Sequence, residues 1–323
     1  MNMEVLKETN FDFLGKKYAG KVRDVYDLPA QAGQKDRLIL ITTDRHSSFD
    51  RIIAHIPSKG QVLNQISAWW FDKTKDIIPN HVLAIPDPNA TIAKKCKTVP
   101  VEAVVRGYLT GITDTAIWTR YSAGERKFGG VTLPDGMKKN QRLPQAIFDP
   151  TTKEEKHDRT LSVDEMIAEG FITKELFDEV RGTAFKLFKR GQELARKNGL
   201  ILVDTKYEFG LDENKHLVLI DEIHTPDSSR YWKLGSYEER VLKGEEPEYF
   251  DKEFLRLWFR EHCDPYKDAV LPEAPQELVD EMSHRYIQMY EQITGEKFVP
   301  GETPVLSRIE RNLKTYARTP TLP

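Results

Sequence analysis

The chain has 323 residues, with 48 basic and 51 acidic side chains and a formal net charge of −3. At about 150 residues per domain this length predicts about two domains, enough for full hydrophobic cores. A hydrophobic content of 39% with so small a net charge excludes a disordered chain and argues against a nucleic-acid partner.

The sequence also favours a cytoplasmic protein with no membrane partner. Its longest apolar runs, such as residues 38–41, are far below the roughly 18 residues needed to span a bilayer. The first residues carry Glu4, Glu8 and Asp12, which is not the pattern of a secretory signal. Cys96 and Cys263 are too far apart for a zinc spacing or a disulfide framework.

The N-terminal part of the chain favours strands around one helix. Residues 38–42 form an apolar, β-branched run typical of a buried strand, and residues 99–105 form another. Residues 60–76 carry apolar side chains at helical spacing, and Pro79 ends the pattern. Residues 29–36 are rich in Pro, Gly and Gln, which predicts a loop.

The rest of the chain combines helices with a hairpin. Thr113 or Asp114 would cap a short helix, and residues 129–158 show no periodicity and predict a long surface loop. The longest helix begins at Thr173 and stops at Asn198-Gly199. Residues 200–208 and 217–223 predict a hairpin, and further helices begin near Asp251 and Pro275. The fold class is therefore mixed α and β, with lobes at residues 1–112 and 113–323.

A glycine turn near the N-terminus is the first candidate for chemistry. Gly15-x4-Gly20-Lys21 resembles a phosphate-binding P-loop, but Val22 follows where Ser or Thr would ligate magnesium, and the flanks predict strands. We therefore reject the P-loop. A glycine turn beside Lys21 and Arg23 could still cover phosphates, and the alternative is an ordinary charged hairpin.

The second candidate is the alternating run of Asp204, Lys206 and Glu208. In a strand these three side chains face the same way. If the hairpin turns at residues 213–214, Lys206 lies opposite Asp221, so that Glu208 and Asp221 are diagonal neighbours within about 7–8 Å. Two such carboxylates would hold one magnesium ion and leave positions for phosphate oxygens. A loop of odd length would turn Asp221 to the other face, and a solvated face with ion pairs is the alternative.

Three further segments place polar groups at the ends of strands. Arg106 follows an apolar strand, where its fork suits a phosphate or carboxylate, and a surface salt bridge is the alternative. Residues 44–50 are dense in hydrogen-bonding groups, although Ser47 or Ser48 would also serve as a helix cap. Residues 227–230 would hold an anion. The histidines, which lack metal-ligand spacing, are expected to be structural or on the surface: His46, His55, His157 and His224.

At these residues the chain resembles the SAICAR synthetase family, in six ordered blocks spread over most of its length. The blocks are Gly20-Lys-Val-Arg-Asp-Val-Tyr26, Thr43-Asp-Arg-His-Ser-Ser-Phe-Asp50, Lys59-Gly-Gln-Val-Leu63, Val101-Glu-Ala-Val-Val-Arg-Gly-Tyr-Leu-Thr-Gly111, Asp204-Thr-Lys-Tyr-Glu-Phe-Gly210 with Asp221-Glu222, and Asp227-Ser-Ser-Arg-Tyr-Trp232. The length and the middle insertion are similar to the longer, fungal form of the family.

The resemblance implies a fold and a reaction. The family fold is two-lobed, distantly like protein kinases and ATP-grasp enzymes, with nucleotide in the inter-lobe cleft, which makes residues 1–112 the ATP-binding lobe. The reaction joins L-aspartate to the carboxylate of the ribonucleotide CAIR, with ATP as substrate and Mg²⁺ as cofactor, and gives SAICAR, ADP and phosphate in purine biosynthesis. The partners are then small molecules, and the oligomeric state stays open. A small-molecule kinase of related fold and a non-catalytic nucleotide-binding module are the alternatives.

The resemblance also implies residue roles. Gly20, Lys21 and Arg23 would cover the ATP phosphates, residues from Glu102 to Val105 would lie along the adenine, and Glu208 and Asp221 would hold magnesium and thereby ATP. The catalytic residues would be Asp204, Lys206 and Arg106. The substrate-binding residues would be Asp44, Ser48, Asp50, Lys59, Arg106, Ser229 and Arg230. The chain departs from the family at Ile112, where a serine is common beside the CAIR phosphate, and at Ser58 and Ser48.

Overall fold

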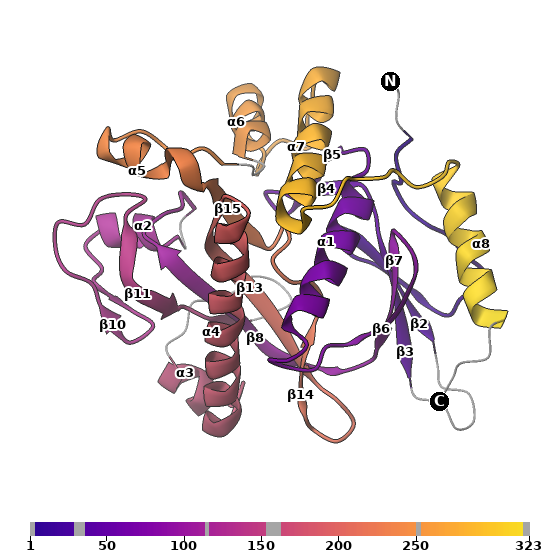
Figure 1. The fold of residues 1–323 in the computed structure, drawn as a ribbon, viewed down its shortest axis with the longest axis horizontal. Helices are drawn as coiled ribbons and strands as arrows, with labels where there is room; N and C mark the ends of the chain where they lie inside the picture. The colour runs from indigo at the N-terminus through magenta and orange to yellow at the C-terminus, as the bar shows by residue number, and fades with distance from the viewer. Residues whose placement is uncertain (1–3, 29–35, 114–115, 153–162, 250–252, 319–323) are drawn as a thin grey trace. The chain divides into compact units, whose positions relative to one another are not determined.

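The computed structural model describes residues 4–28, 36–113, 116–152, 163–249 and 253–318 (Figure 1). The chain forms two compact units. The first comprises residues 1–71, 81–95 and 251–323, and the second comprises residues 72–80 and 96–250.

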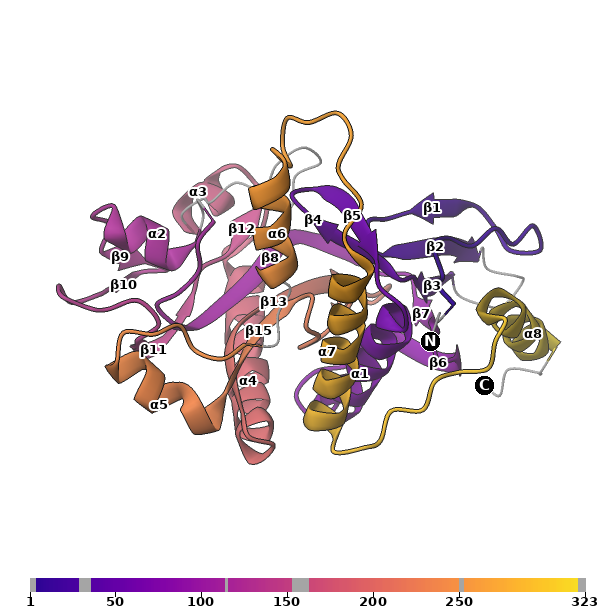
Figure 2. The same cartoon turned by 90° about the horizontal axis from the view of Figure 1, so that it is seen from above.

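The first unit is built on an antiparallel sheet of order β1-β2-β3-β7-β6. Its elements are β1 (Lys17–Ala19), β2 (Arg23–Leu28), β3 (Arg37–Thr42), β4 (Arg45–Ser48), β5 (Arg51–His55), α1 (Lys59–Thr74), β6 (Val82–Asp87), β7 (Ala90–Lys94), α6 (Glu253–His262), α7 (Gln276–Thr294) and α8 (Val305–Arg318). Strands β4 and β5 form a separate hairpin. Helices α1 and α7 lie side by side in both views (Figures 1 and 2).

The C-terminal helix completes the core of this first unit. Helix α8 packs against β6, and its Ile309 and Leu313 are buried with Ile39, Ile41 and Ile92 of the sheet. Burial of these large apolar side chains stabilises the fold by about 25 cal/mol for each Å² of apolar surface removed from water. The sheet of the first unit therefore depends on the far end of the chain.

The second unit is built on a six-stranded antiparallel sheet. Its path is β11-β8-β13-β14, with β12 paired to β8 and β15 paired to β13. Its elements are β8 (Lys97–Tyr108), α2 (Ile117–Ser122), β9 (Lys127–Phe128), β10 (Val131–Thr132), β11 (Arg142–Phe148), β12 (Thr151–Thr152), α3 (Val163–Ala168), α4 (Lys174–Lys197), β13 (Leu200–Leu211), β14 (Leu217–Ile220), β15 (Ser229–Lys233) and α5 (Leu234–Leu242).

Helix α4 covers one face of this sheet. Its Thr173 cap accepts a hydrogen bond from the Leu176 amide, and Gly199 ends the helix in the left-handed conformation at φ 72°. Phe177, Val180 and Ala184 lie on its buried side and recur at helical spacing. The start and end predicted from the sequence are both confirmed.

Most long elements were predicted correctly. The expected strands at residues 38–42, 99–105, 200–208 and 217–223 are β3, β8, β13 and β14, although β14 already ends at Ile220. The helices expected at residues 60–76, from Thr173 and from Pro275 are α1, α4 and α7. A helix, α6, also lies where one was expected near Asp251, but Asp251 itself, like residues 29–35 and His157, lies outside the described residues.

Other expectations were wrong. The segment 129–158 contains β11 and β12, which pair with β8, so its described part includes strands of the second sheet and is not one long loop. Helix α2 begins after Ala116, so Thr113 does not cap it, and Asp114 lies outside the described residues. The lobe boundary at residue 112 stays a prediction. The compact units divide the chain differently, because β8 belongs to the sheet of β13 and α8 packs on β6.

Candidate active site

One face of the second sheet carries charged residues from three strands. Asp204, Lys206 and Glu208 alternate along β13 with Thr205, Tyr207 and Phe209, which are buried. Since cross-strand partners share a face, the pairings Asp204–Arg106, Glu208–Glu102 and Asp204–Arg230 gather six charged side chains. We call this set the polar face: Glu102, Arg106, Asp204, Lys206, Glu208 and Arg230.

The opposite face of the same sheet is closed by α4. A Cβ on Gly107 of β8 would lie 3.2 Å from Phe188 and 3.1 Å from Gln192, both on α4. Helix α4 therefore packs against the sheet on the side away from Arg106. The alternation predicted from the sequence is confirmed, with one face for the helix and one for charged groups.

Lys206 is the centre of one half of the polar face. Its Nζ donates to Glu102 Oε1 at 2.5 Å and lies 3.7 Å from Glu208 Oε1. Burial alone would lower the pKa of Lys206, but the carboxylates of Glu102, Glu208 and Asp221 outweigh it and raise that pKa above its usual value. Lys206 is therefore a permanent cation at neutral pH and not a proton acceptor.

Two arginines form the other half of the polar face. Arg230 Nη1 donates to Asp204 Oδ2 at 2.8 Å, and Arg106 Nε donates to Asp149 Oδ2 at 2.8 Å. Arg120 Nη1 also reaches both Asp149 oxygens at 3.2 Å. Each guanidinium is a planar fork that a carboxylate holds in a fixed orientation. Sequence reasoning missed Asp149 and Arg120, because their pairing with Arg106 depends on long-range contacts.

The predicted position of Asp221 needs a correction. The hairpin pairs Leu211 with Leu217 and Glu208 with Ile220, so Lys206 does not lie opposite Asp221. The loop has an odd number of residues, the case in which strand alternation no longer brings Asp221 to the face of Glu208. However, β14 ends at Ile220, and Asp221 takes a positive φ of 64°, so the alternation stops before it. The electrostatic effect of Asp221 on Lys206 shows that it still lies near the polar face.

A buried histidine supports the segment that carries Asp221. The Tyr207 hydroxyl and His224 Nε2 are 2.6 Å apart, and the Tyr231 hydroxyl donates to the His224 carbonyl at 2.8 Å. A Cβ on Gly191 of α4 would lie 2.4 Å from the His224 ring, so only glycine admits the ring there. The expectation that His224 is structural agrees with its complete burial.

In the first unit, the predicted glycine turn joins β1 to β2. The Gly20 amide donates to the Arg23 carbonyl at 2.8 Å, and Lys21 is exposed, with its Nζ 2.5 Å from Asp50 Oδ1. The turn lies inside a β-hairpin, which confirms the rejection of the P-loop. It presents one flexible ammonium group on a backbone turn.

Arg45 holds this turn from beneath and was not among the predicted residues. Its guanidinium donates to the carbonyls of Gly20 at 2.9 Å and Lys21 at 3.3 Å, and to Asp24 Oδ1 at 2.8 Å. Arg45 is only 6% exposed. A fixed planar fork with several donors can satisfy the turn carbonyls and a carboxylate together.

Residues 44–50 form a hairpin and not a helix cap. Ser48 lies in β4, and Phe49 and Asp50 make the turn with positive φ values of 57° and 58°. Asp44 is buried and accepts hydrogen bonds from the Leu6 amide at 2.7 Å and the Gly60 amide at 2.8 Å. Burial raises the pKa of Asp44 to about 6, against the lowering effect of these amides.

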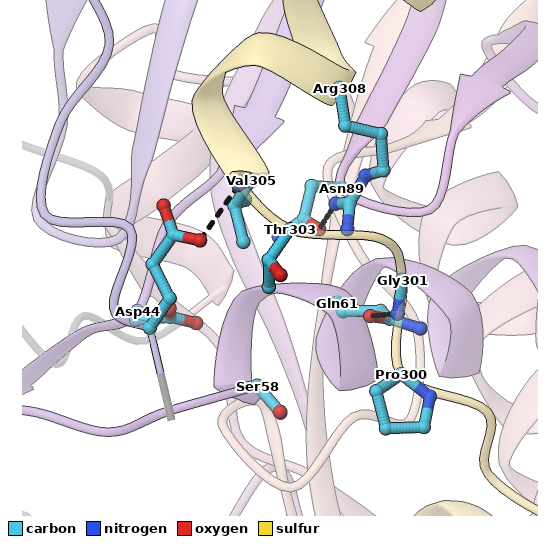
Figure 3. Close-up of a pocket in the computed structure, with 10 residues that line it drawn as sticks. Asp44, Ser58, Gln61, Asn89, Pro300, Gly301, Thr303, Val305 and Arg308 are labelled. Atoms are coloured by element: carbon cyan, nitrogen blue, oxygen red, sulfur yellow. Dashed lines mark hydrogen bonds between the residues drawn. The ribbon is translucent and has the colours of Figure 1, made fainter. Parts of the chain in front are cut away.

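Asp44 also lines a cavity of about 160 Å³ that lies wholly within the first unit. Figure 3 shows Asp44, Gln61 and Arg308 around it, together with the chain at Gly301. Its wall is completed by Pro300, Gly301 and Thr303, in the segment that leads into α8. Asp44 therefore has a structural role in the first unit, where it holds the Leu6 and Gly60 amides.

The other predicted site residues are mostly held in local contacts. Ser48 Oγ accepts from Arg256 Nε at 3.2 Å, and Ser229 Oγ donates to Thr205 Oγ1 at 2.7 Å. Lys59 is fully buried, with its Nζ 5.5 Å from the centre of the Tyr286 ring. Arg23 lies half-buried at the start of β2.

The segment predicted to lie along adenine is an inner strand. Residues 102–105 of β8 pair with β13 on one side and with β11 and β12 on the other. Many of the backbone N–H and C=O groups that would bind the edge of an adenine are therefore already hydrogen-bonded within the sheet. The Val105 side chain is also buried. The adenine contact stays a prediction.

Comparisons with known proteins identify the family. The family model of SAICAR synthetase matches residues 16–273. The chain belongs to the SAICAR synthetase family. It is 58% identical over 315 residues to the phosphoribosylaminoimidazole-succinocarboxamide synthase of Legionella pneumophila (strain Paris), covering 96% of this chain and 98% of that protein. It is 55% identical over 313 residues to the chloroplastic synthase of Arabidopsis thaliana, covering 95% of this chain and 75% of that protein.

A solved structure agrees. The SAICAR synthase of Saccharomyces cerevisiae in complex with SAICAR matches with a TM-score of 0.77 and 31% identity, over 91% of this chain and all of that one. The family and fold expected from the six sequence blocks are confirmed. As a member of the SAICAR synthetase family, the chain is an ATP-dependent ligase that joins CAIR and L-aspartate, and the comparisons do not support a kinase or a binding module. None of the helices in the described part of the chain could span a membrane.

The charges of the polar face fit the magnesium ion that a family of ATP-using ligases implies. In the half of the polar face around Lys206, three carboxylates, Glu102, Glu208 and Asp221, act on this one ammonium group, which leaves excess negative charge there for a divalent ion. Within the described ranges, no group of three or more His, Cys, Asp or Glu side chains is arranged to hold a metal ion. Mg²⁺ in ATP-using enzymes is usually held by one or two carboxylates together with substrate phosphates.

Proposed function

We propose that the polar face is where this chain joins L-aspartate to the carboxylate of CAIR, through an acyl phosphate. The observation that carries the proposal is the order of charges along β13. Asp204, with the two arginines beside it, lies at one end, and Lys206 and Glu208 follow over four residues, roughly 13 Å of strand. A substrate that is anionic at both ends, with a carboxylate to be phosphorylated, matches this order.

The chemistry follows from the weakness of a carboxylate as an electrophile. A carboxylate oxygen of CAIR attacks the γ-phosphorus of ATP, the bond to the β–γ bridging oxygen breaks, and ADP leaves. The neutral amine of L-aspartate then attacks the acyl carbon. The carbon–oxygen bond to the phosphoryl group breaks, phosphate leaves with both electrons of that bond, and the nitrogen loses a proton to give the amide. Positioning and charge stabilisation supply most of the rate enhancement in such a reaction.

The residues of the polar face then take distinct roles. Arg106 and Arg230 bind CAIR, chiefly its ribose phosphate, as planar forks already oriented by carboxylates. Lys206 places its permanent positive charge beside the phosphoryl group in transfer. Asp204 holds Arg230 in place and lies near the CAIR carboxylate. Glu208 and Asp221 would hold Mg²⁺, which when bound offsets the charge of the phosphate oxygens.

Other predicted residues complete the proposal. Gly20, Lys21 and Arg23 cover the ATP phosphates, and Glu102 and Val105 lie along the nucleotide. Asp44, Ser48, Asp50, Lys59 and Ser229 help to bind substrates. The support is their place in the sequence blocks together with the exposed Lys21 and Asp50 on neighbouring turns. A cytoplasmic location, small-molecule substrates and no nucleic-acid or membrane partner belong to the same proposal.

An isotope experiment tests the acyl phosphate. CAIR labelled with ¹⁸O in both carboxylate oxygens is incubated with ATP, Mg²⁺ and L-aspartate, and the released phosphate is analysed by mass. Since the attacking oxygen leaves with the phosphoryl group, each phosphate carries one ¹⁸O and each amide carbonyl keeps the other. A reaction without L-aspartate is the control for label exchange. Unlabelled phosphate formed together with SAICAR would refute the proposed route.

A further inference from the structure

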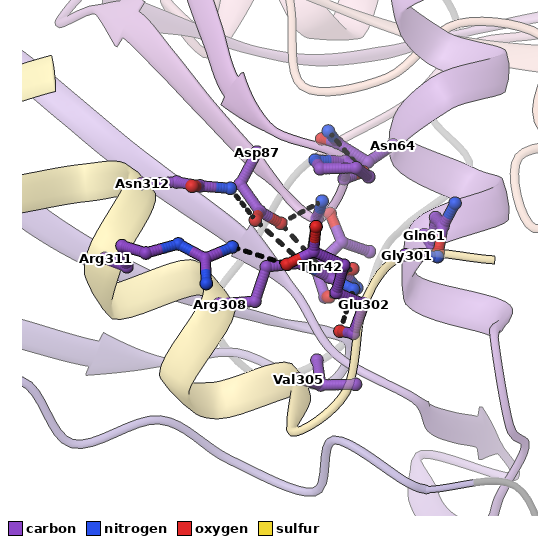
Figure 4. A network of polar contacts seen from close by, with 12 residues as sticks. Thr42, Gln61, Asn64, Asp87, Gly301, Glu302, Val305, Arg308, Arg311 and Asn312 are labelled. Carbon is purple, nitrogen blue, oxygen red and sulfur yellow. Dashed lines mark hydrogen bonds and ion pairs between the residues drawn. The ribbon is translucent and has the colours of Figure 1, made fainter. Parts of the chain in front are cut away.

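Arg308 of the C-terminal helix α8 is buried in a polar network of the first unit. It is 5% exposed and lies beyond residues 16–273, the part that the family model matches. Its Nε and Nη2 donate to the two Asp87 oxygens at 3.0 and 3.2 Å, and Nη2 also donates to Asn89 Oδ1 at 2.6 Å. Its Nη1 donates to the Glu302 carbonyl at 3.0 Å. Figure 4 shows this arginine pointing from α8 toward Asp87.

The network continues from Arg308 to the end of β3. Asn89 is 3% exposed, and its amide nitrogen donates to Asp87 Oδ1 at 2.8 Å. Its Nδ2 donates to the Thr42 carbonyl at 3.0 Å, and its carbonyl accepts from the Thr42 amide at 2.8 Å. Thr42 is therefore held on both of its backbone groups by the residue that Arg308 orients.

Thr42 leads directly into the segment 43–50, and the neighbouring contacts fix the start of α1 as well. Asp44 accepts from the Gly60 amide at the beginning of α1. Gln61 of α1 donates to the Val299 carbonyl at 2.8 Å and accepts from the Gly301 amide at 2.9 Å. A Cβ on Gly301 would lie 2.0 Å from Arg308 Nη1, so a larger residue there would displace the guanidinium. Residues 43–59 are therefore held at both ends. Arg308 holds Thr42 through Asn89, and the chain at Val299 and Gly301 holds Gln61 of α1.

We propose that Arg308 is a positioning residue for the ligase reaction. It acts through Asp87 and Asn89 to fix the segment 43–50, whose hairpin turn brings Asp50 to Lys21. The inference rests on the proposed function of that segment in substrate binding. Removing the guanidinium leaves the buried Asp87 carboxylate with neutral donors alone, from the Asn89 amide and Asn312 Nδ2, and takes the Arg308 donor from Asn89 Oδ1. The turn then rearranges to find water or other donors.

The test compares two arginines on the same helix. Arg308→Met removes the buried fork at similar length, and Arg308→Lys keeps the charge but cannot reach Asp87 and Asn89 together. Arg311→Met is the matched control, because Arg311 makes an exposed ion pair with Glu302 at 2.7 Å. The kinetic constants for ATP, CAIR and L-aspartate are measured well below the Tm of each variant, together with amide hydrogen exchange across residues 42–50.

For Arg308→Met we expect kcat/KM to fall on the order of 10- to 100-fold for at least one substrate, with faster exchange at residues 42–50. For Arg308→Lys we expect a smaller decrease of kcat/KM. This variant keeps the test valid if Arg308→Met does not fold. The kcat/KM of Arg311→Met should stay within about twofold of the wild-type value. Wild-type kcat/KM for all three substrates in a folded Arg308 variant, with only a lower Tm, would overturn the inference.

A variant within the segment separates this inference from the proposed function. Asp50→Asn changes an exposed residue in the hairpin turn of this segment, where Asp50 pairs with Lys21. If Asp50→Asn lowers kcat/KM and the Arg308 variants do not, the segment serves substrate binding but Arg308 does not position it. If neither changes kcat/KM, the proposed function of the segment fails, and the inference falls with it.

Discussion

The buried pair of Tyr207 and His224 predicts how stability depends on pH. Complete burial lowers the pKa of His224 to about 3. In the unfolded chain this histidine becomes protonated near pH 6.5, whereas in the folded protein it becomes protonated only near pH 3. The contribution of His224 is therefore fully present above pH 6.5 and is lost as the pH falls from 6.5 toward 3.

The size of the effect follows from the pKa difference. One pH unit below 6.5 corresponds to about 1.4 kcal/mol per proton, so the free energy of unfolding falls by about 2 kcal/mol between pH 7.5 and pH 5 through this residue alone. His224→Gln keeps a polar group for the Tyr207 hydroxyl but cannot bind the proton. Between pH 7.5 and pH 5, the free energy of unfolding of the variant should therefore fall by about 2 kcal/mol less than that of wild type. Its free energy of unfolding at pH 7.5 is lower than that of wild type, because glutamine fits less well than histidine beside Gly191.

The assay is urea unfolding of wild type and His224→Gln at pH 7.5, 6 and 5. His216→Gln is the control, since the His216 side chain is 75% exposed on the loop of the same hairpin. We expect the control to keep the wild-type dependence on pH. Parallel pH profiles for wild type and His224→Gln would refute the reasoning, because they would mean that His224 takes up its proton in the folded protein near pH 6.

Three further predictions concern the proposed active site. Asp221→Asn removes a carboxylate without changing volume, so turnover should be lost while Tm stays near wild type; full turnover at ordinary Mg²⁺ concentration would refute the metal role. Arg230→Ala should raise the KM for CAIR on the order of 10- to 100-fold with little change for ATP, as expected for lost hydrogen bonds to a charged group, and an effect confined to ATP would contradict the assignment. Arg45→Met leaves Asp24 buried without its guanidinium and should lower the free energy of unfolding by about 3 kcal/mol or more in urea. The same variant should raise the KM for ATP, because the turn carrying Lys21 loosens, and an unchanged KM would show that the turn does not depend on Arg45.

The sequence predicted best what depends on local periodicity. The alternation of Asp204, Lys206 and Glu208 required only that β13 be a strand, and the structure places all three on one face. Helix α4 was predicted from its cap to its glycine stop because both signals are local. Its buried face was visible in the same spacing.

The errors concern contacts that a local pattern does not encode. The register of β13 and β14 depends on the length of their loop, and one residue changes the face of every later side chain. Asp149 was hidden in a segment without periodicity, because its importance lies in pairing with Arg106 and Arg120 from other elements. The buried contacts of Arg45 and Arg308 likewise join residues far apart in the chain.

The compact units do not follow the order of the chain, for the same reason. Helix α8 follows all the strands in sequence, yet its Ile309 and Leu313 complete the core of the N-terminal sheet. Strand β8 was counted with the N-terminal part, although its hydrogen-bond partners lie in β13 and β11. Packing partners of this kind are chosen by the whole chain and not by a window of residues.

The most direct test of the account is phosphate release from ATP and Mg²⁺, with CAIR and L-aspartate supplied together and each omitted in turn. We predict release only in the full mixture, with one SAICAR formed per phosphate. Release that does not need L-aspartate, or no release with all substrates present, would contradict the central claim that this chain is the ligase.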